Sequence, residues 1–197
     1  RSSLDGSSTV CLVALHPHKA ELRAANVGDS GFLILRRHGV RQQSTAPLGT
    51  LDAFGVAAAG DQRSFHIAFR SPQQLRSFNM PYQLGCAPDS GEGPDPRFET
   101  PNDAAVVRVP VRGGDILLLA TDGLFDNMNE EQVLDVIESA LDATPQEQAN
   151  LLARRAQELS LDRDRDSPFA VLAKDNDIMW GGGRPDDITV IVSHIEW

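Results

Sequence analysis

Cysteine is scarce in this sequence of 197 residues: Cys11 and Cys86 are the only two. They form no CxxC pair, and no cysteine–histidine spacing matches a zinc site, which excludes a zinc-stabilised module. The five histidines also lack the HExxH spacing of a zinc protease. Cys11 lies in an apolar run, which predicts a buried thiol and is compatible with a reducing compartment.

Positive charge is also in short supply. The chain has 18 lysines and arginines against 28 acidic residues, a formal net charge of −10. This balance argues against a nucleic-acid partner, because nothing neutralises a phosphate backbone. It does not exclude a phosphorylated substrate, since a bound metal can supply local positive charge. No apolar run approaches the length of a membrane span, so we expect no membrane-spanning segment.

The spacing of apolar residues predicts an α+β domain of antiparallel strands and helices. Three short apolar runs near the N-terminus are separated by turn residues, which favours an antiparallel meander. After Asp126 the apolar period changes from two to about 3.6 residues, and Thr144, Pro145 and Glu147 form the start of a further helix. The expected strands cover residues 9–15, 21–27, 32–36, 106–111, 116–120 and 187–195, and the expected helices cover about 130–141, 144–161 and 169–174.

We expect a single domain over residues 1–197 with two long loops. Residues 45–70 are rich in small side chains and have no sustained period, which predicts a surface insertion. Residues 87–103 carry four prolines and two glycines, a composition that excludes regular structure. Because a strand pattern starts within the first ten residues, we interpret the sequence as the C-terminal portion of a longer domain.

Three aspartate motifs stand beside apolar strand patterns. They are residues 26–31 (NVGDSG), 121–126 (TDGLFD) and 185–190 (PDDITV). Any one of them alone also fits an ordinary turn or helix cap. Together they place carboxylates at the ends of strands that we expect in the same sheet layer, where unpaired charges are costly. Converging acids repel one another, and a divalent cation such as Mg²⁺ or Mn²⁺ relieves that repulsion.

Several neighbours of these acids have an expected role. Gly123 allows the backbone to turn sharply after Asp122 and to approach a ligand closely. Asp186 and Asp187 are adjacent, so on a strand they point to opposite faces and only one can enter a shared site. Arg184 could hold a carboxylate or a phosphate, or be an ordinary loop arginine. Further oxygens are available from Thr121 and Asp126.

These segments resemble the metal-dependent protein serine/threonine phosphatases of type 2C. The similar segments are residues 6–10 (GSSTV), 25–30 (ANVGDS), 119–126 (LATDGLFD) and 186–190 (DDITV). The resemblance implies an α-β-β-α sandwich of antiparallel sheets, here without its N-terminal part. It also implies a binuclear Mg²⁺ or Mn²⁺ centre, a metal-activated water with no side-chain nucleophile, a phosphorylated protein as substrate, and a monomer.

Further segments at residues 78–84 and 182–187 are similar to a mitochondrial subgroup of that family linked to coenzyme Q biosynthesis. The resemblance places Asp122 and Asp186 as metal ligands, Asp29 as an acid that helps to hold a further metal, and Gly123 at the turn beside the metals. Asp187 stands where many relatives have asparagine, and we do not expect it to be a primary ligand. By the same resemblance, the expected compartment is a mitochondrion or a plastid.

One expected feature of the family has no counterpart here. The family has an upstream Asp-Gly whose aspartate bridges both metals, whereas Asp5-Gly6 of this chain lies directly against the GSSTV strand. We therefore expect this stretch alone to bind metal poorly and to turn over little substrate.

Two other classes of function fit parts of the sequence. One is a phosphatase-like domain that binds partners without catalysis, whose signature would be the loss of the remaining ligands. The other is a calcium-binding module, because residues 162–167 alternate acids as an EF-hand loop does. That loop requires a glycine where Ser167 stands and a glutamate where Ala173 stands, which favours a solvated helix end.

Overall fold

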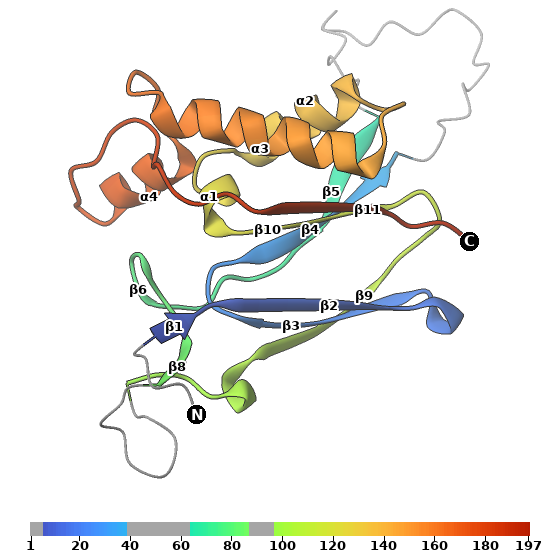
Figure 1. Cartoon of the computed structure of the whole chain (residues 1–197), viewed down its shortest axis with the longest axis horizontal. Helices are drawn as coiled ribbons and strands as arrows, with labels where there is room; N and C mark the ends of the chain where they lie inside the picture. Colours follow the sequence, from blue (N-terminus) through green and yellow to red (C-terminus); the bar gives the residue numbers. More distant parts are fainter. Residues whose placement is uncertain (1–5, 39–63, 87–96) are drawn as a thin grey trace, which may run out of the picture.

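The structure, a computed structural model, describes residues 6–38, 64–86 and 97–197. Two antiparallel sheets lie face to face, and helices cover the outer face of one of them (Figure 1). The first sheet has the order β11–β10–β4–β5 and consists of β4 (Gly31–Arg37), β5 (Phe65–Arg70), β10 (Ile116–Ala120) and β11 (Val190–His194). The second has the order β2–β3–β9 and consists of β2 (Val10–His16), β3 (Glu21–Val27) and β9 (Ala105–Pro110). The expected α+β class is confirmed.

Shorter elements complete the described part of the chain. Two small strand pairs are β1 (Gly6–Ser8) with β8 (Leu84–Cys86), and β6 (Leu75–Ser77) with β7 (Met80–Pro81). The helices are α1 (Asp122–Phe125), α2 (Glu130–Ser139), α3 (Pro145–Leu161) and α4 (Pro168–Asp175), and single 3₁₀ turns lie at Pro17–Lys19 and Pro101–Asp103. None of the helices in these residues has the length and apolar character needed to cross a membrane.

Strand β4 forms the centre of the core. Its apolar run is continuous because both of its faces are buried: Phe32 and Ile34 pack between the two sheets, and Leu33 and Leu35 pack under the helices. All four side chains are at most 1% exposed. The strand is therefore held on both sides, which fixes the position of the polar segment just before it.

The helical layer contacts the outer face of the first sheet, with α3 against β11 and α2 against β5 (Figure 1). The expected start of α3 is confirmed. The Thr144 hydroxyl accepts a hydrogen bond from the Glu147 amide at 3.3 Å, and the Glu147 carboxylate accepts one from the Thr144 amide at 2.8 Å. These bonds satisfy two donors that the first turn of a helix leaves free.

Replacing Thr144 by alanine is expected to lower the free energy of unfolding by about 1 kcal/mol, because the side-chain acceptor at the helix start is lost. Urea unfolding followed by circular dichroism measures this. Thr144→Ser is the matched control, since it keeps the hydroxyl; if both variants lose the same stability, the cap is not the cause.

The first three strands do not form the expected meander. β2 and β3 pair as expected, but β3 and β4 belong to different sheets, so residues 28–30 cross between sheets instead of closing a hairpin. Gly28 makes this crossing possible: its φ is +105°, and a Cβ there would overlap Tyr82 and Thr9. Both the hairpin and the sheet crossing need a short polar link, which is why the link itself did not distinguish them.

The expected insertion at residues 45–70 is wrong at its C-terminal end. Residues 65–70 form β5, which pairs with β4 in the first sheet, and Phe65 is 2% exposed. Residues 45–63 of that segment lie outside the described residues. In the second expected loop, residues 101–103 form a 3₁₀ turn with Thr100 and Asp103 as its capping box, while residues 87–96 also lie outside the described part.

Candidate functional site

The three aspartate motifs meet at one end of the first sheet. In the strand register, Ala120 of β10 pairs with Gly31 of β4 on one side and with Val190 of β11 on the other. Asp29 lies just before Gly31, Asp122 just after Ala120, and Asp186 before Val190. Because neighbouring strands are antiparallel, a strand start and a strand end share the same edge. The expected convergence of the acids at one sheet layer therefore agrees with the strand register.

The second and third motifs are joined directly by hydrogen bonds. The Thr121 hydroxyl donates to the carbonyl of Asp187 at 3.1 Å and accepts from the amide of Thr189 at 3.0 Å. The Thr121 amide also donates to the Thr189 carbonyl. The Thr121 hydroxyl, a possible metal ligand by its sequence position, thus holds the two segments together.

Gly123 lies where these segments come closest. A Cβ at this position would overlap the carbonyl oxygen of Asp187 and lie 3.0 Å from its carbonyl carbon. Glycine is therefore required by the close approach of the two backbones, as the sequence predicted for a sharp turn beside a site.

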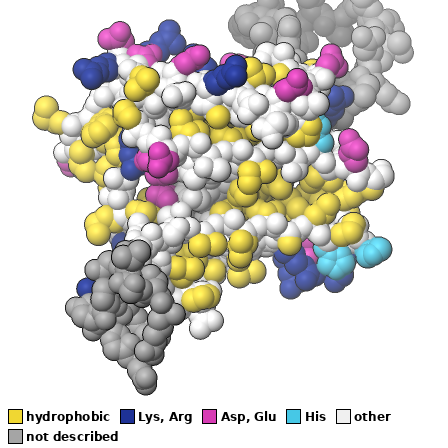
Figure 2. Space-filling view, viewed as in Figure 1, with side chains coloured by type: hydrophobic (Ala, Val, Ile, Leu, Met, Phe, Trp, Pro, Cys, Tyr) yellow, Lys and Arg dark blue, Asp and Glu magenta, His cyan; other side chains and the backbone are white. Residues whose placement is uncertain are grey.

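Arg184 forms the centre of the acid cluster. Its guanidinium contacts the carboxylate of Asp122 at 3.1 Å, that of Asp186 at 3.3 Å, and that of Asp126 at a shorter distance. The Arg184 side chain is 19% exposed, so these ion pairs are shielded from much of the solvent. Of the alternatives considered for Arg184, the structure shows contacts with carboxylates. On the face shown in Figure 2, acidic side chains gather over this region near α1.

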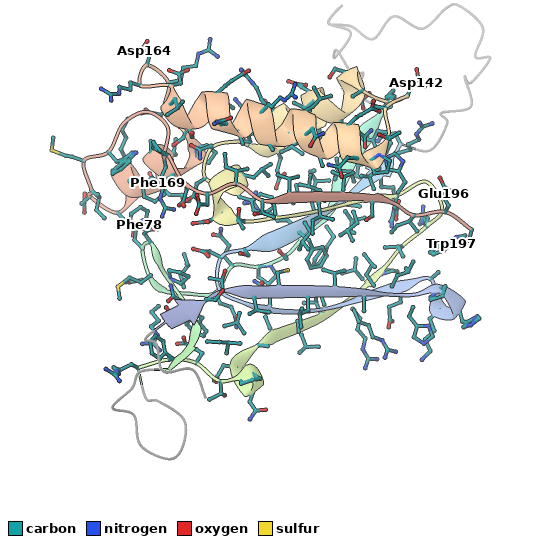
Figure 3. All side chains as sticks on the ribbon, in the orientation of Figure 1. Phe78, Asp142, Asp164, Phe169, Glu196 and Trp197 are labelled. Atoms are coloured by element: carbon teal, nitrogen blue, oxygen red, sulfur yellow. The ribbon has the colours of Figure 1, made fainter. Side chains whose placement is uncertain are left out.

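The arginine is itself fixed by two neighbours. The Asn127 side chain accepts a hydrogen bond from the Arg184 amide and donates one to its carbonyl, both at 2.8 Å. The guanidinium lies over the ring of Phe169, with 4.7 Å between its carbon and the ring centroid. Phe169 in turn packs against Phe78, and Figure 3 shows these two rings together beside α4. The site thus includes Asn127 and Phe169, for which no motif in the sequence predicts a role.

The glycines before Arg184 hold this loop closely against α3. The Gly183 amide donates to the Asp162 carbonyl at 2.6 Å, and a Cβ at Gly183 would overlap the carbonyl of Leu159. Gly182 packs equally closely, because a Cβ there would lie 2.8 Å from the carbonyl oxygen of Asp162. Asp162 itself ends α3, and the acids that follow it are exposed, as expected for a solvated helix end.

Two acids of the cluster bind protons more readily than usual. Burial raises the pKa of Asp126 to about 6, although its hydrogen bond from Arg184 acts in the opposite direction. Burial also raises the pKa of Asp29, and the nearby charge of Asp122 adds to this effect. Asp29 is 8% exposed. The cluster therefore contains more negative charge than Arg184 neutralises.

The raised pKa of Asp126 leads to a pH prediction for the metal-free chain. Between about pH 4 and 6 the folded state binds this proton more readily than the unfolded state, so the contribution of Asp126 to stability falls as pH rises. Asp126→Asn does not ionise and should gain stability relative to wild type from pH 4 to 7, by at most about 3 kcal/mol. Urea unfolding in EDTA across this range measures the difference. A difference that stays constant, or that reverses, would contradict the raised pKa.

The donor set suits a hard divalent cation, because carboxylate oxygens are the ligands that Mg²⁺ and Mn²⁺ prefer. The geometry is only partly suitable. Within residues 6–38, 64–86 and 97–197, no group of three or more histidine, cysteine, aspartate or glutamate side chains is placed to hold a metal ion. The carboxylates of Asp122 and Asp186 point to one cation, and that cation is the guanidinium of Arg184.

Cys11 lies close to this end of the sandwich. It lines a small cavity of about 130 Å³ between β2 and the first sheet, together with Ser30 and Thr121. Its side chain is half-buried, and burial raises the pKa of its thiol to about 11. The expected buried thiol is thus only partly enclosed, and it stays protonated at neutral pH.

Most of this chain is similar in sequence to known phosphatases. The family model for stage II sporulation protein E (SpoIIE) matches residues 56–196. The chain is 39% identical to protein phosphatase PTC7 homolog fig of Drosophila ananassae, over 97% of this chain and 51% of that protein. The homologue of Drosophila grimshawi gives 39% identity, 97% of this chain and 55% of that protein. The chain therefore spans about half the length of these relatives.

Solved structures support the same fold. The photosystem II phosphatase PBCP superposes with a TM-score of 0.70 and 26% identity, over 98% of this chain and 65% of that one. A serine-threonine phosphatase 2C from Toxoplasma gondii gives a TM-score of 0.50 and 16% identity, over 94% and 57%, and shows the fold alone. The chain belongs to the PP2C/SpoIIE family of phosphatases, in which it resembles the PTC7 homologues.

Proposed function

We propose that this chain contributes the greater part of the active site of a divalent-metal-dependent protein serine/threonine phosphatase. The observation that carries the proposal is the meeting of Asp29, Asp122 and Asp186 at one end of the first sheet, in a chain that belongs to a phosphatase family. The substrate is a phosphoserine or phosphothreonine ester of a protein, and the expected product is inorganic phosphate.

Asp122 and Asp186 would hold the Mg²⁺ or Mn²⁺, and Asp29 would add negative charge beside them. When bound, such an ion supplies a Lewis acid that activates water and orients the phosphate oxygens. The chain itself does the positioning. Thr121 joins the two ligand segments, and Gly123 lets them approach closely.

We also propose that the binuclear centre is completed by an Asp-Gly pair outside this chain. The test compares the 197-residue chain with a form extended at its N-terminus to the length of the PTC7 homologues. With Mn²⁺ and p-nitrophenyl phosphate, and then with a phosphothreonine peptide, the extended form should hydrolyse both and the shorter chain little. An inactive extended form would overturn the phosphatase proposal, whereas full activity of the shorter chain would overturn only the missing Asp-Gly.

The partner of this site is a phosphorylated protein, and we propose that the chain acts as a monomer inside a mitochondrion or a plastid. One similar structure is named as a photosystem II phosphatase, which supports an organellar setting. Size-exclusion chromatography with light scattering tests the oligomeric state. Imaging of the extended form, tagged at its C-terminus, tests the compartment, and a purely cytosolic signal would contradict it.

One observation favours a second candidate, a phosphatase-like domain that binds partners without catalysis. Arg184 neutralises part of the acid cluster, so the fold does not need a metal to gather these side chains. Calorimetric titration of the extended form with Mn²⁺ separates the two. A non-catalytic domain shows no heat of binding at the cluster, whereas the phosphatase shows binding that depends on Asp122.

A further inference from the structure

Arg184 occupies the position between the two acids that the proposed function assigns to a metal. The carboxylates of Asp122 and Asp186 contact different nitrogens of the same guanidinium, Nη1 at 3.1 Å and Nη2 at 3.3 Å. We propose that Arg184 is a built-in counter-ion that competes with the divalent cation, so that metal loading requires its guanidinium to leave both carboxylates. This inference rests on the proposed function, because it concerns the same two ligands.

The charges explain why such a counter-ion is needed. Asp29, Asp122, Asp126 and Asp186 converge at the sheet end, and Asp29 is only 8% exposed and the Asp126 side chain 13%, so a carboxylate charge there is costly without a counter-ion. In the described part of the chain, Arg184 is the one basic side chain that forms ion pairs with these acids. A divalent cation brings twice its charge to the same oxygens, so the two cations exclude each other both sterically and electrostatically.

The surroundings of Arg184 hold it by contacts other than those with Asp122 and Asp186. Asn127 binds the Arg184 backbone through both its amide and its carbonyl, so the residue stays in place when its side chain moves. Asp126 is partly buried, with its side chain 13% exposed, and it already contacts the guanidinium, while the ring of Phe169 lies against the same group. The arginine can therefore release Asp122 and Asp186 while it keeps a charged partner and an aromatic one. An ordinary loop arginine would have neither.

This arrangement has a measurable consequence for metal affinity. If Mn²⁺ binds only when the guanidinium has left the two carboxylates, the apparent affinity for Mn²⁺ is reduced to the fraction of molecules in that open state. Removing the competing charge should therefore strengthen the binding of Mn²⁺, even though it removes a stabilising ion pair from the metal-free protein. An arginine that merely supported the site would have the opposite effect, because its loss would disorder the ligands.

The test uses the N-terminally extended form and measures Mn²⁺ dissociation constants from the free-ion signal in electron paramagnetic resonance. Arg184→Gln is expected to bind Mn²⁺ at least about tenfold more tightly than wild type, in line with a competing state that dominates without metal. Arg155→Gln is the matched control: it removes an equal charge from an exposed pair with Glu158 on α3 and should leave the affinity unchanged. Arg184→Lys keeps the charge and should bind Mn²⁺ less tightly than Arg184→Gln.

Thermal unfolding gives a second readout that does not depend on the affinity. In EDTA, Arg184→Gln should unfold at a lower temperature than wild type, because the counter-ion of the acids is lost. Saturating Mn²⁺ should raise its unfolding temperature by more than it raises that of wild type, because the metal then replaces the counter-ion. If this variant does not fold, the comparison of Arg184→Lys with wild type decides. A lysine bridges two carboxylates less well than a planar guanidinium, so tighter Mn²⁺ binding is expected there too, and unchanged binding overturns the inference.

The outcomes also separate this inference from the proposed function. If Arg184→Gln binds Mn²⁺ no more tightly than wild type while Asp122→Asn loses Mn²⁺ binding, the proposed competition is wrong and the proposed metal site stands. Mn²⁺ binding that Asp122→Asn does not change would overturn the proposed site itself. Tighter binding in Arg184→Gln that is lost when Asp122→Asn is added supports both.

Discussion

Replacing Asp122 by asparagine is expected to lower Mn²⁺-dependent hydrolysis of p-nitrophenyl phosphate by at least about tenfold in the N-terminally extended form, because a charged oxygen at the metal is lost. Asparagine keeps the shape of the side chain, so the start of α1 and the hydrogen bonds of Thr121 should remain. The loss should therefore be one of charge at the site and not of folding. Initial rates over a range of Mn²⁺ concentrations measure it.

The matched control is Asp142→Asn. Asp142 is exposed, and Figure 3 places it at the far end of the helical layer from the acid cluster. This variant removes the same charge from the chain and should keep the wild-type rate. Circular dichroism verifies that both variants are folded. Wild-type turnover by Asp122→Asn at low Mn²⁺ would refute the metal role of this residue.

The elements of this fold could be predicted wherever their signals are local. The bounds of β3 and β10 agree with the predicted residues, because each apolar run is limited by turn residues on both sides. The start of α3 could be predicted from three residues that satisfy its first turn by themselves. These signals require no knowledge of what the segment packs against.

The division of the strands between two sheets could not be predicted in the same way. Residues 28–30 are as short and polar as a hairpin link, yet they cross from the second sheet to the first. The informative signal is in β4, whose unbroken apolar run indicates a strand buried on both faces. In a simple meander with one solvated face, the middle strand is buried on one face only and its apolar residues alternate with polar ones. Strand β5 was missed because it follows a long segment with no apolar period.

Only the part of the candidate site that lies at strand ends could be predicted from the sequence. Asp29, Asp122 and Asp186 each lie beside an end of β4, β10 or β11. Because these strands are antiparallel neighbours, the three acids lie at the same edge of the sheet. The part played by Arg184 depends on a loop held against the end of α3 and on Asn127, and neither contact leaves a pattern in the sequence. The sequence pointed to the acids and to Arg184 as a residue that could hold a carboxylate, but not to the three carboxylates that its guanidinium contacts.

Replacing Gly123 by alanine is expected to lower the free energy of unfolding by about 3 kcal/mol, the upper end of what overpacking a dense site costs. The added methyl group would overlap the Asp187 carbonyl, which is the acceptor of the Thr121 hydroxyl. The clash involves backbone on one side and a helix start on the other, so no flexible side chain can move aside. The segment that carries Asp186 must therefore shift away from Asp122, and Mn²⁺ binding should weaken together with stability.

Gly6→Ala is the control for this variant, because a Cβ at Gly6 meets no atom within 4 Å and its backbone is not left-handed. It should leave both the urea midpoint and the Mn²⁺ dissociation constant unchanged. If Gly123→Ala proves as stable as Gly6→Ala, the two backbone segments are not in close contact in solution. The distance between Asp122 and Asp186 would then not be fixed by the fold, and the metal would have to gather its own ligands.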